Sequence, residues 1–359
     1  MAKSGAKNGG LAGDCADPWP KGRGVKRINL ALQGGGAHGA LTWGVLDRLL
    51  EDDGIAIEGV TGASAGAVNG AVMAYGLSVG GREGARDLLR AVWRRVSEIA
   101  ALTMMQPSPL DRMTGLGGMD YAPGYWMLDT LSRVFSPYQF NFFDINPLRD
   151  TIHEHIDFEK LRHCKTVKLY VSATNVRRGR IKIFELEEMS LDAVMASACL
   201  PYLHKAVEID GEAYWDGGFM GNPAIFPLIY GAETPDVLLV QINPINIEKT
   251  PTSAQEIIDR LNTITFNAGL MREMRAISFV TKLIDKGFDD GGRLKRLNMH
   301  VVDAEDVMQN LGFSSKLNAD WNFLCHLRDV GYARTDAWLA AHRQDLGKRS
   351  TADIDAMYL

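Results

Sequence analysis

One serine in the sequence is placed as a nucleophile would be. Ser64 is the centre of Gly62-Ala63-Ser64-Ala65-Gly66, which matches G-x-S-x-G and lies between a short apolar run and a helix of small residues. At the tip of such a sharp strand–helix turn, the residues two positions before and after the serine must be small, because strand and helix nearly touch. The alternative is a serine that only caps the helix. Because every neighbour is Gly or Ala, we expect a nucleophile.

Three consecutive glycines form a second candidate element. Gly34, Gly35 and Gly36 follow the apolar run 28–32 and precede a helical pattern that begins near Gly39. Their backbone N–H groups are not shielded by side chains, and they lie where a helix dipole favours negative charge. The loop can therefore hold a phosphate or an oxyanion, although a plain tight turn is the alternative.

The glycine spacing alone leaves nucleotide binding open. Gly34, Gly36 and Gly39 match the G-x-G-x-x-G pattern of dinucleotide sites. Such a site expects an acidic residue at the end of the second strand, whereas Glu58 lies at its start. A P-loop would end in Gly-Lys-Ser/Thr, but His38 comes before the last glycine here. Dinucleotide binding is the last-ranked alternative, since it leaves the serine motif unexplained.

A serine hydroxyl needs a general base, and the sequence offers two candidates. His300, in the last apolar run, fits the chain order Ser, Asp, His of α/β-hydrolases, but no aspartate at a strand end is an evident partner for it. Asp216 follows an apolar strand end at Trp215, and Gly217 and Gly218 let the backbone turn away from its carboxylate. Burial would raise the pKa of Asp216 and make it a stronger base. A simple turn is the alternative.

The surrounding sequence predicts the elements that position these groups. Apolar runs end at Leu32 and near Thr61, and each is followed by a tight turn and a helical pattern. This alternation predicts a parallel sheet with crossover helices. Gly34 and Ser64 are 30 residues apart, one βα unit, so both should open at the same edge of the sheet. We therefore expect an α/β fold of three layers, with a central, mainly parallel sheet flanked by helices and a helical C-terminal extension.

Composition along the chain suggests three segments. Residues 1–26 are predicted to be a flexible arm, 27–243 a catalytic domain, and 244–359 a mainly helical extension. Within the catalytic domain, residues 100–146 are rich in Met and aromatic side chains and interrupt the pattern. This insertion is either a flexible apolar wall or lid that accepts fatty acyl chains, or extra helices packed in the ordinary way.

Three motifs, in this order and spacing, resemble those of the patatin-like phospholipase family. They are the glycine loop 34–39, the serine motif 62–66 and the turn 216–218. The resemblance covers about residues 27–243. Weaker matches accompany the three motifs: Asn146-Pro147-Leu148-Arg149, Ala173-Thr174-Asn175, Ala196-Ser197-Ala198 and Asn222-Pro223.

The resemblance implies a Ser–Asp dyad without a catalytic histidine. Ser64 would be the nucleophile, Asp216 the general base, and the N–H groups of Gly34, Gly35 and Gly36 the oxyanion hole. The implied reaction is acyl transfer to water, with neither a metal nor a cofactor.

The other motif residues are expected to support this geometry. They are His38, Gly39, Gly62, Gly66, Gly217 and Gly218. His38 is a departure, because many relatives carry Arg or Lys there and histidine is mostly neutral at pH 7.

The expected substrate is the carboxylic ester of a lipid, as in a phospholipase or lysophospholipase. A storage polyester or a neutral glyceride would require the same chemistry. A non-catalytic lipid-binding protein with this fold is the alternative from another class, and the intact serine, aspartate and glycine loop argue against it.

Charge and composition limit the kinds of partner and the cellular location that we expect. The chain has 359 residues and a net charge of −5 without a basic tract, which disfavours nucleic acid. No apolar run approaches the ~18 residues of a membrane span, and residues 1–26 lack the apolar core of a secretory signal. Four scattered cysteines indicate free thiols in a reducing compartment. We expect a cytoplasmic protein that meets an acyl lipid or a lipid surface, peripherally at membranes, and that can form a homodimer through its C-terminal helices.

Overall fold

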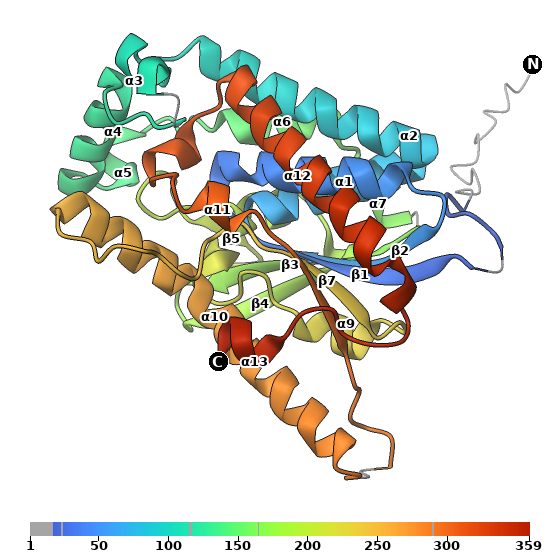
Figure 1. Ribbon diagram of the computed structural model, residues 1–359. Coiled ribbons are helices and arrows are strands. Elements are labelled where there is room, and N and C mark those ends of the chain that lie inside the picture. The colour runs from blue at the N-terminus through green and yellow to red at the C-terminus, as the bar shows by residue number, and fades with distance from the viewer. Residues whose placement is uncertain (1–16, 23, 115–116, 164, 289–290) are drawn as a thin grey trace, which may run out of the picture.

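A central sheet lies between layers of helices in the computed structural model, which describes residues 17–22, 24–114, 117–163, 165–288 and 291–359 (Figure 1). Within these residues the sheet has eight strands. They are β1 (Lys26–Leu32), β2 (Ile55–Gly62), β3 (Lys168–Asn175), β4 (Arg180–Glu185), β5 (Val207–Ile209), β6 (Glu212–Asp216), β7 (Asp236–Val240) and β8 (Asn298–Val302).

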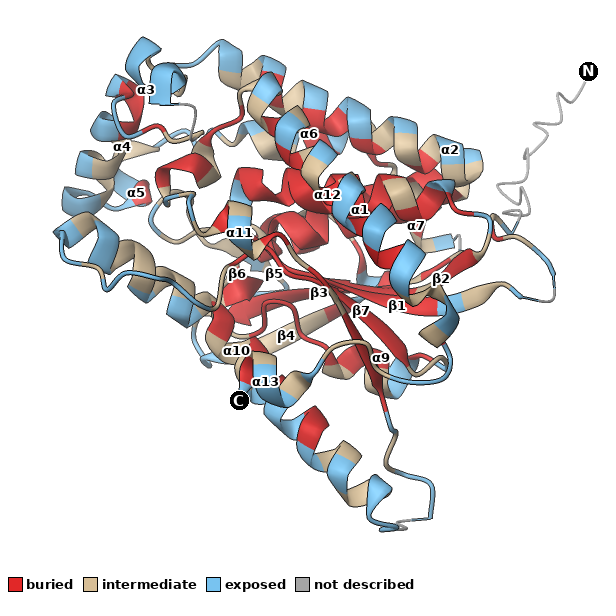
Figure 2. Ribbon diagram, viewed as in Figure 1, coloured by how far each residue is buried: buried red, intermediate tan, exposed pale blue. Residues whose placement is uncertain are grey.

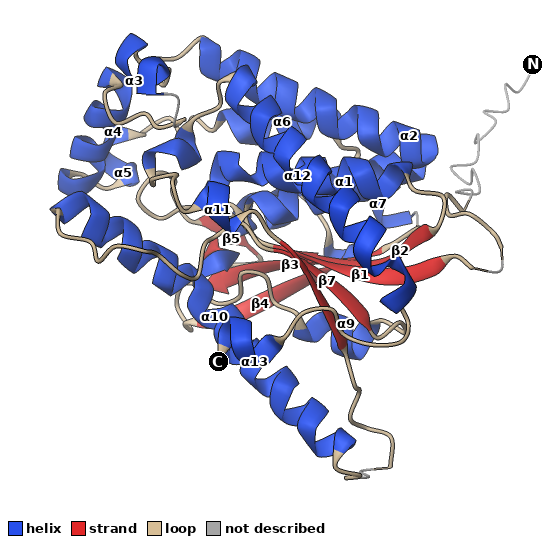
Figure 3. Cartoon of the chain, in the orientation of Figure 1, coloured by secondary structure: helices blue, strands red, loops and turns tan. Residues whose placement is uncertain are grey.

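The described helices cover both faces of this sheet (Figure 3). The α-helices are α1 (Gly39–Glu51), α2 (Ala65–Ala101), α3 (Pro109–Thr114), α4 (Pro123–Val134), α5 (Pro137–Phe140), α6 (Pro147–His155), α7 (Phe158–His163), α8 (Leu191–Ser197), α9 (Phe226–Gly231), α10 (Ala254–Asp285), α11 (Glu305–Met308), α12 (Trp321–His342) and α13 (Ile354–Tyr358). The short 3-10 turns are η1 (Gly36–His38), η2 (Leu186–Glu188), η3 (Gly217–Phe219), η4 (Ser314–Leu317) and η5 (Arg343–Asp345).

The sheet is parallel in its centre and antiparallel at one side. Its order is β5-β6-β3-β2-β1-β7-β8, and β4 pairs with β3 outside this path. Strands β3, β2, β1, β7 and β8 run parallel, whereas β4, β5 and β6 are paired antiparallel. The predicted α/β class with a mainly parallel, helix-flanked sheet is confirmed.

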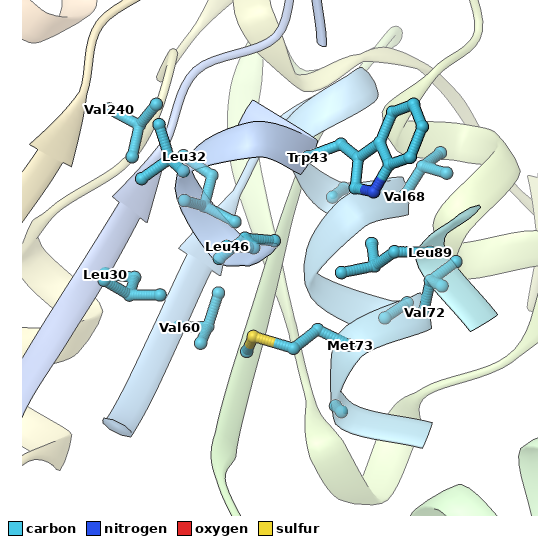
Figure 4. Packing of buried hydrophobic residues seen from close by; sticks show 14 of the residues in the cluster. Leu30, Leu32, Trp43, Leu46, Val60, Val68, Val72, Met73, Leu89 and Val240 are labelled. Carbon is cyan, nitrogen blue, oxygen red and sulfur yellow. The ribbon is translucent and has the colours of Figure 1, made fainter. Parts of the chain in front are cut away.

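Alternation along the central strands builds two separate cores. Leu30 and Leu32 of β1 point into the larger cluster, with α1, α2 and α12, as Figure 4 shows for its central part. Ala31, between them, faces the smaller cluster on the other side, with α9, α10 and α13. Because a strand flanked on both faces is buried on both sides, the central strands are mostly apolar along their length. Figure 2 shows these strands as the buried centre of the molecule.

The C-terminal segment completes the same sheet and the same helical layer. β8 pairs with β7 in parallel, and α12 packs along α1. Gly44 of α1 and Gly331 of α12 allow this close approach, since a Cβ on either would clash with the backbone of the other helix. The boundaries predicted at residues 26 and 243 remain predictions.

Part of the predicted arm lies outside the described residues, which begin at 17. Trp19 is buried, and its indole N–H donates to the carbonyl of Thr166 at 3.2 Å. Of the four cysteines, Cys199 and Cys325 are free thiols. The other two, Cys15 and Cys164, lie outside the described residues.

Candidate active site

The predicted sharp turn at Ser64 is present between β2 and α2. Ser64 has φ 53° and ψ −125°, a left-handed backbone that is strained for a residue with a Cβ. A Cβ on Gly62 would lie 2.6 Å from the carbonyl carbon of Gly66, so the strand and helix do nearly touch. The Ser64 side chain makes no capping hydrogen bond to the helix. This removes the main support for a purely capping role.

The glycine loop lies directly against this turn. A Cβ on Gly34 would be 2.5 Å from the Cβ of Ser64 and 2.6 Å from the carbonyl oxygen of Ala63. Gly36 has φ 60°, where a side chain is unfavourable. Both glycines are therefore required by the close contact and by the backbone conformation.

Only part of the predicted oxyanion hole is free. The Gly34 N–H, one of the three predicted donors, already donates to Asn222 Oδ1 at 2.6 Å and is therefore occupied within the protein. The N–H groups of Gly35 and Gly36 make no hydrogen bond to another described residue. The loop can therefore offer two donors, held beside Ser64 by the Asn222 side chain.

Strand register brings Asp216 to Ser64. β3 continues past Val171, its last residue paired with β2. β6 pairs with residues 173–175 of β3, on the same edge of that strand. Gly62, at the end of β2, pairs with Val171, while Asp216, at the end of β6, pairs with Ala173. Because β2 and β6 run in opposite directions along β3, their C-terminal ends meet about two residues, roughly 7 Å, apart.

The carboxyl group of Asp216 is fully buried. Burial raises its pKa to about 7, as predicted, while the Gly218 N–H, the Ser64 hydroxyl and the charge of Lys316 act against this rise. Asp216 Oδ1 accepts from Gly218 N–H at 2.7 Å, and Oδ2 is buried without a hydrogen-bond partner among the described residues. One carboxylate oxygen is thus fixed, and the other is left unsatisfied beside a serine hydroxyl. Hydrogen bonds of a resting active site are often long or poorly aligned in this way.

His38 is buried behind the glycine loop and carries no charge at neutral pH. Burial, and then the nearby Lys316, hold its pKa well below the usual value. Its Nε2 lies 2.7 Å from Ser315 Oγ, and that hydroxyl donates to the Gly312 carbonyl at 2.6 Å. The single proton of the hydroxyl is thereby used, so His38 Nε2–H must be the donor. His38 anchors η1 to η4 as a neutral group.

His300 has an aspartate partner after all, but not near Ser64. Its Nε2 lies 3.0 Å from Asp236 Oδ1, and its Nδ1 lies 2.9 Å from Thr351 Oγ1. Asp236 is the first residue of β7, which runs parallel to β1. It therefore lies at the N-terminal end of the parallel strands, whereas Ser64 and the glycine loop follow their C-terminal ends. The pair is buried in the structural core and does not form a triad with Ser64.

Several polar residues that hold the site were not assigned roles from the sequence. Gln33 Oε1 accepts from the N–H groups of Ile242 and Asn243, each at 2.8 Å. Ser197 Oγ accepts from the Ser64 N–H at 2.9 Å. A signal existed for Gln33, a polar residue directly after β1, and for Asn243, which follows β7 closely. No local pattern pointed to Lys316, whose Nζ donates to Asn243 Oδ1 at 2.9 Å.

A cavity of about 610 Å³ lies beside the strand that carries Asp216. Trp215 and Phe219, on either side of the aspartate turn, line it together with Phe135 and Val134 of the insertion. Across the described residues, no group of three or more His, Cys, Asp or Glu side chains is placed to hold a metal ion. In the same part of the chain, no helix combines the length and apolarity needed to span a bilayer.

The chain is similar to two solved structures at low sequence identity. Among solved structures, the chain is similar to VipD from Legionella pneumophila, with 15% identity and a TM-score of 0.42 over 89% of this chain and 67% of that one. It is also similar to the type III effector protein ExoU, with 17% identity and a TM-score of 0.33 over 92% of this chain and 55% of that one. A search of curated protein sequences found no match.

The sequence model of the family described as patatin-like phospholipase matches residues 30–229. This region contains the glycine loop, the serine turn and the aspartate turn, and it makes up more than half of the chain. The chain therefore belongs to the patatin-like phospholipase family.

Proposed function

We propose that this protein is a serine acyl hydrolase that cleaves carboxylic esters of lipids through Ser64 and Asp216. Family membership supports lipid ester hydrolysis in general. The observation that carries the dyad is the meeting of β2 and β6 on one edge of β3, which sets a strained serine beside a buried carboxylate. A pKa of about 7 suits a general base at neutral pH, because such a group is partly ionised and still basic.

The proposed reaction has two steps with one acid–base group. Asp216 takes the proton from Ser64 Oγ as that oxygen attacks the ester carbonyl carbon. The carbonyl oxygen becomes an oxyanion and accepts hydrogen bonds from the N–H groups of Gly35 and Gly36. When the ester C–O bond breaks, the leaving alcohol oxygen takes the proton from Asp216.

The second step returns the enzyme to its starting state. Asp216 accepts a proton from a water molecule, whose oxygen attacks the acyl-enzyme carbonyl. The intermediate then collapses, the fatty acid leaves, and Asp216 returns the proton to Ser64 Oγ. Atoms and charges balance with water as the only co-reactant.

An apolar surface beside the site supports a lipid substrate. Large apolar side chains of the insertion are exposed: Leu102, Met104, Leu110, Met113, Tyr121, Trp126, Met127, Val134, Phe135, Tyr138, Phe142, Phe143 and Ile145. We call this set the apolar face. Among the described residues of the insertion, a small group, Met119, Ala122 and Tyr125, forms a core of its own. Exposed apolar patches of this kind are typical of contact with lipids or proteins, and we propose contact with a lipid surface.

Hydrolysis of p-nitrophenyl acyl esters from acetyl to palmitoyl, together with phospholipid vesicles, tests this function. Wild type is expected to hydrolyse both kinds of substrate, and Ser64→Ala neither. The chain-length profile separates a long acyl groove from a small ester pocket. Equal turnover by wild type and Ser64→Ala would contradict the proposal, and so would a complete lack of turnover of both substrates by wild type.

A further inference from the structure

A lysine from the C-terminal segment is built into the back of the glycine loop. Lys316 Nζ donates to Asn243 Oδ1 at 2.9 Å, and Asn243 Nδ2 donates to the Gly34 carbonyl at 2.8 Å. The Lys316 carbonyl lies against Gly36 so closely that a Cβ on that glycine would clash with it. The main chain of Lys316 therefore packs against the loop that faces Ser64, and its side chain is linked to the loop through Asn243.

The charges around Lys316 come from three elements. Asp216 of β6 and Asp259 of α10 favour the charged form of Lys316. His38 of η1, in the glycine loop, is also close to Lys316 but is neutral. Asp259 in turn lies near Asp120 of the insertion. Burial lowers the pKa of Lys316 to about 8, although the residue as a whole is partly exposed, so the ammonium still carries its charge at pH 7.

Among the described residues, Lys316 is the charged group that acts on Asp216. Its charge favours the ionised carboxylate and so opposes the rise in the pKa of Asp216 that burial causes. A positive charge in a site of low dielectric acts more strongly than one in water. The same ammonium is linked to the glycine loop through Asn243, whose amide donates to the Gly34 carbonyl.

We propose that Lys316 is a positioning residue that supplies a positive charge to the active site, favouring the ionised form of Asp216 and negative charge at the glycine loop. The inference rests on the proposed function. It adds a residue that lies 87 positions beyond the end of the family match at 229. The C-terminal segment is then part of the active site as well as of the sheet.

The pH profile of kcat/KM on a soluble p-nitrophenyl ester tests this role. In wild type, activity should rise as Asp216 ionises near pH 7 and fall as Lys316 loses its proton near pH 8. Lys316→Met removes a charge that lowers the pKa of Asp216, so the acid limb should move up by about one pH unit. Activity at pH 7 should then fall about fivefold, and the alkaline limb should disappear.

Two further variants serve as a charge-retaining comparison and as a control. Lys316→Arg retains the charge and does not titrate near pH 8, so the acid limb should return and the alkaline limb should move well above pH 8. Lys295→Met is a matched control, since Lys295 is also partly buried and donates to a carbonyl, that of Ala232, far from the site. Its profile should equal that of wild type.

The outcomes separate the inference from the function on which it rests. An unchanged acid limb in Lys316→Met, with Ser64→Ala inactive, would overturn the role of Lys316 and leave the dyad standing. If Lys316→Met does not fold, an alkaline limb that stays near pH 8 in Lys316→Arg would overturn the role equally. Full activity of Ser64→Ala would remove the dyad and the inference together.

Discussion

The loops that meet at Ser64 and the insertion of residues 100–146 differ in how tightly the chain holds them. At the site, glycines leave no space for a Cβ, and buried amide side chains fix the backbone. In the insertion, Met113, Phe142 and Phe143 are each at least 75% exposed. The proposed chemistry thus lies where atoms are fixed, and the proposed lipid contact lies where apolar groups are uncovered. Changes at the site should affect every substrate, and changes in the insertion only lipid assemblies.

The largest effect is expected from removing the base. Asp216→Asn keeps an oxygen for the Gly218 N–H but cannot accept the serine proton. We expect kcat/KM to fall by about 10⁴-fold on soluble esters and vesicles alike. Near-normal turnover by folded Asp216→Asn would contradict the dyad.

The same variant should be more stable than wild type at alkaline pH. The folded-state pKa of Asp216, about 7, lies above its ordinary value of 3.8, so folded wild type binds this proton more tightly than unfolded chain does. Its contribution to the free energy of unfolding is therefore lost as pH rises from about 4 to 7. Melting curves of wild type and Asp216→Asn should diverge over this range, in favour of the variant.

A smaller but still general loss is expected from crowding the glycine loop. A Cβ at Gly34 would meet Ser64 Cβ at 2.5 Å, so Gly34→Ala must displace the loop or the serine. A shift of about 1 Å in a catalytic group can reduce turnover about 10²-fold. Gly80→Ala is the control, because a Cβ there has nothing within 4 Å. Equal rates for the two variants would show that the loop accommodates a Cβ at Gly34, in contradiction to the close contact with Ser64.

The insertion should show a selective and still smaller effect. Phe142→Ser with Phe143→Ser removes two rings that contact each other edge to face on the apolar face. We expect about a tenfold loss on phospholipid vesicles, since each exposed ring contributes a few kcal/mol at most to lipid contact, and no change on p-nitrophenyl acetate. Val79→Ser, at an exposed apolar residue of α2, is the control. An equal loss on both substrates would place these rings in the site instead of the lipid contact.

The smallest effect on activity is expected at His300. Its partners are buried Asp236 and half-buried Thr351, neither of them at the Ser64 site. His300→Gln should therefore change kcat/KM less than about threefold while lowering the melting temperature. A loss of several orders of magnitude would restore a histidine to the mechanism.

The predictable part of this molecule is the part encoded by neighbouring residues. The turn at Ser64 follows from small residues two positions away, and the sheet follows from apolar runs that alternate with helical patterns. Contacts between residues far apart in the chain could not be predicted from local sequence patterns. Asn222 reaches the Gly34 N–H across 188 residues, and Asp236 reaches His300 across 64. Lys316 enters the site from a short turn without any local motif.

The central claim is that Ser64 is a nucleophile activated by Asp216, and labelling by a fluorophosphonate tests it most directly. Peptide mass spectrometry locates the adduct, and the rate is followed from pH 5 to 9 in wild type and Asp216→Asn. We predict one adduct, on Ser64, at a rate that rises with a midpoint near pH 7, and labelling of Asp216→Asn slower by about 10³-fold or more. An adduct on another residue, or equal rates in the two proteins, would contradict the account.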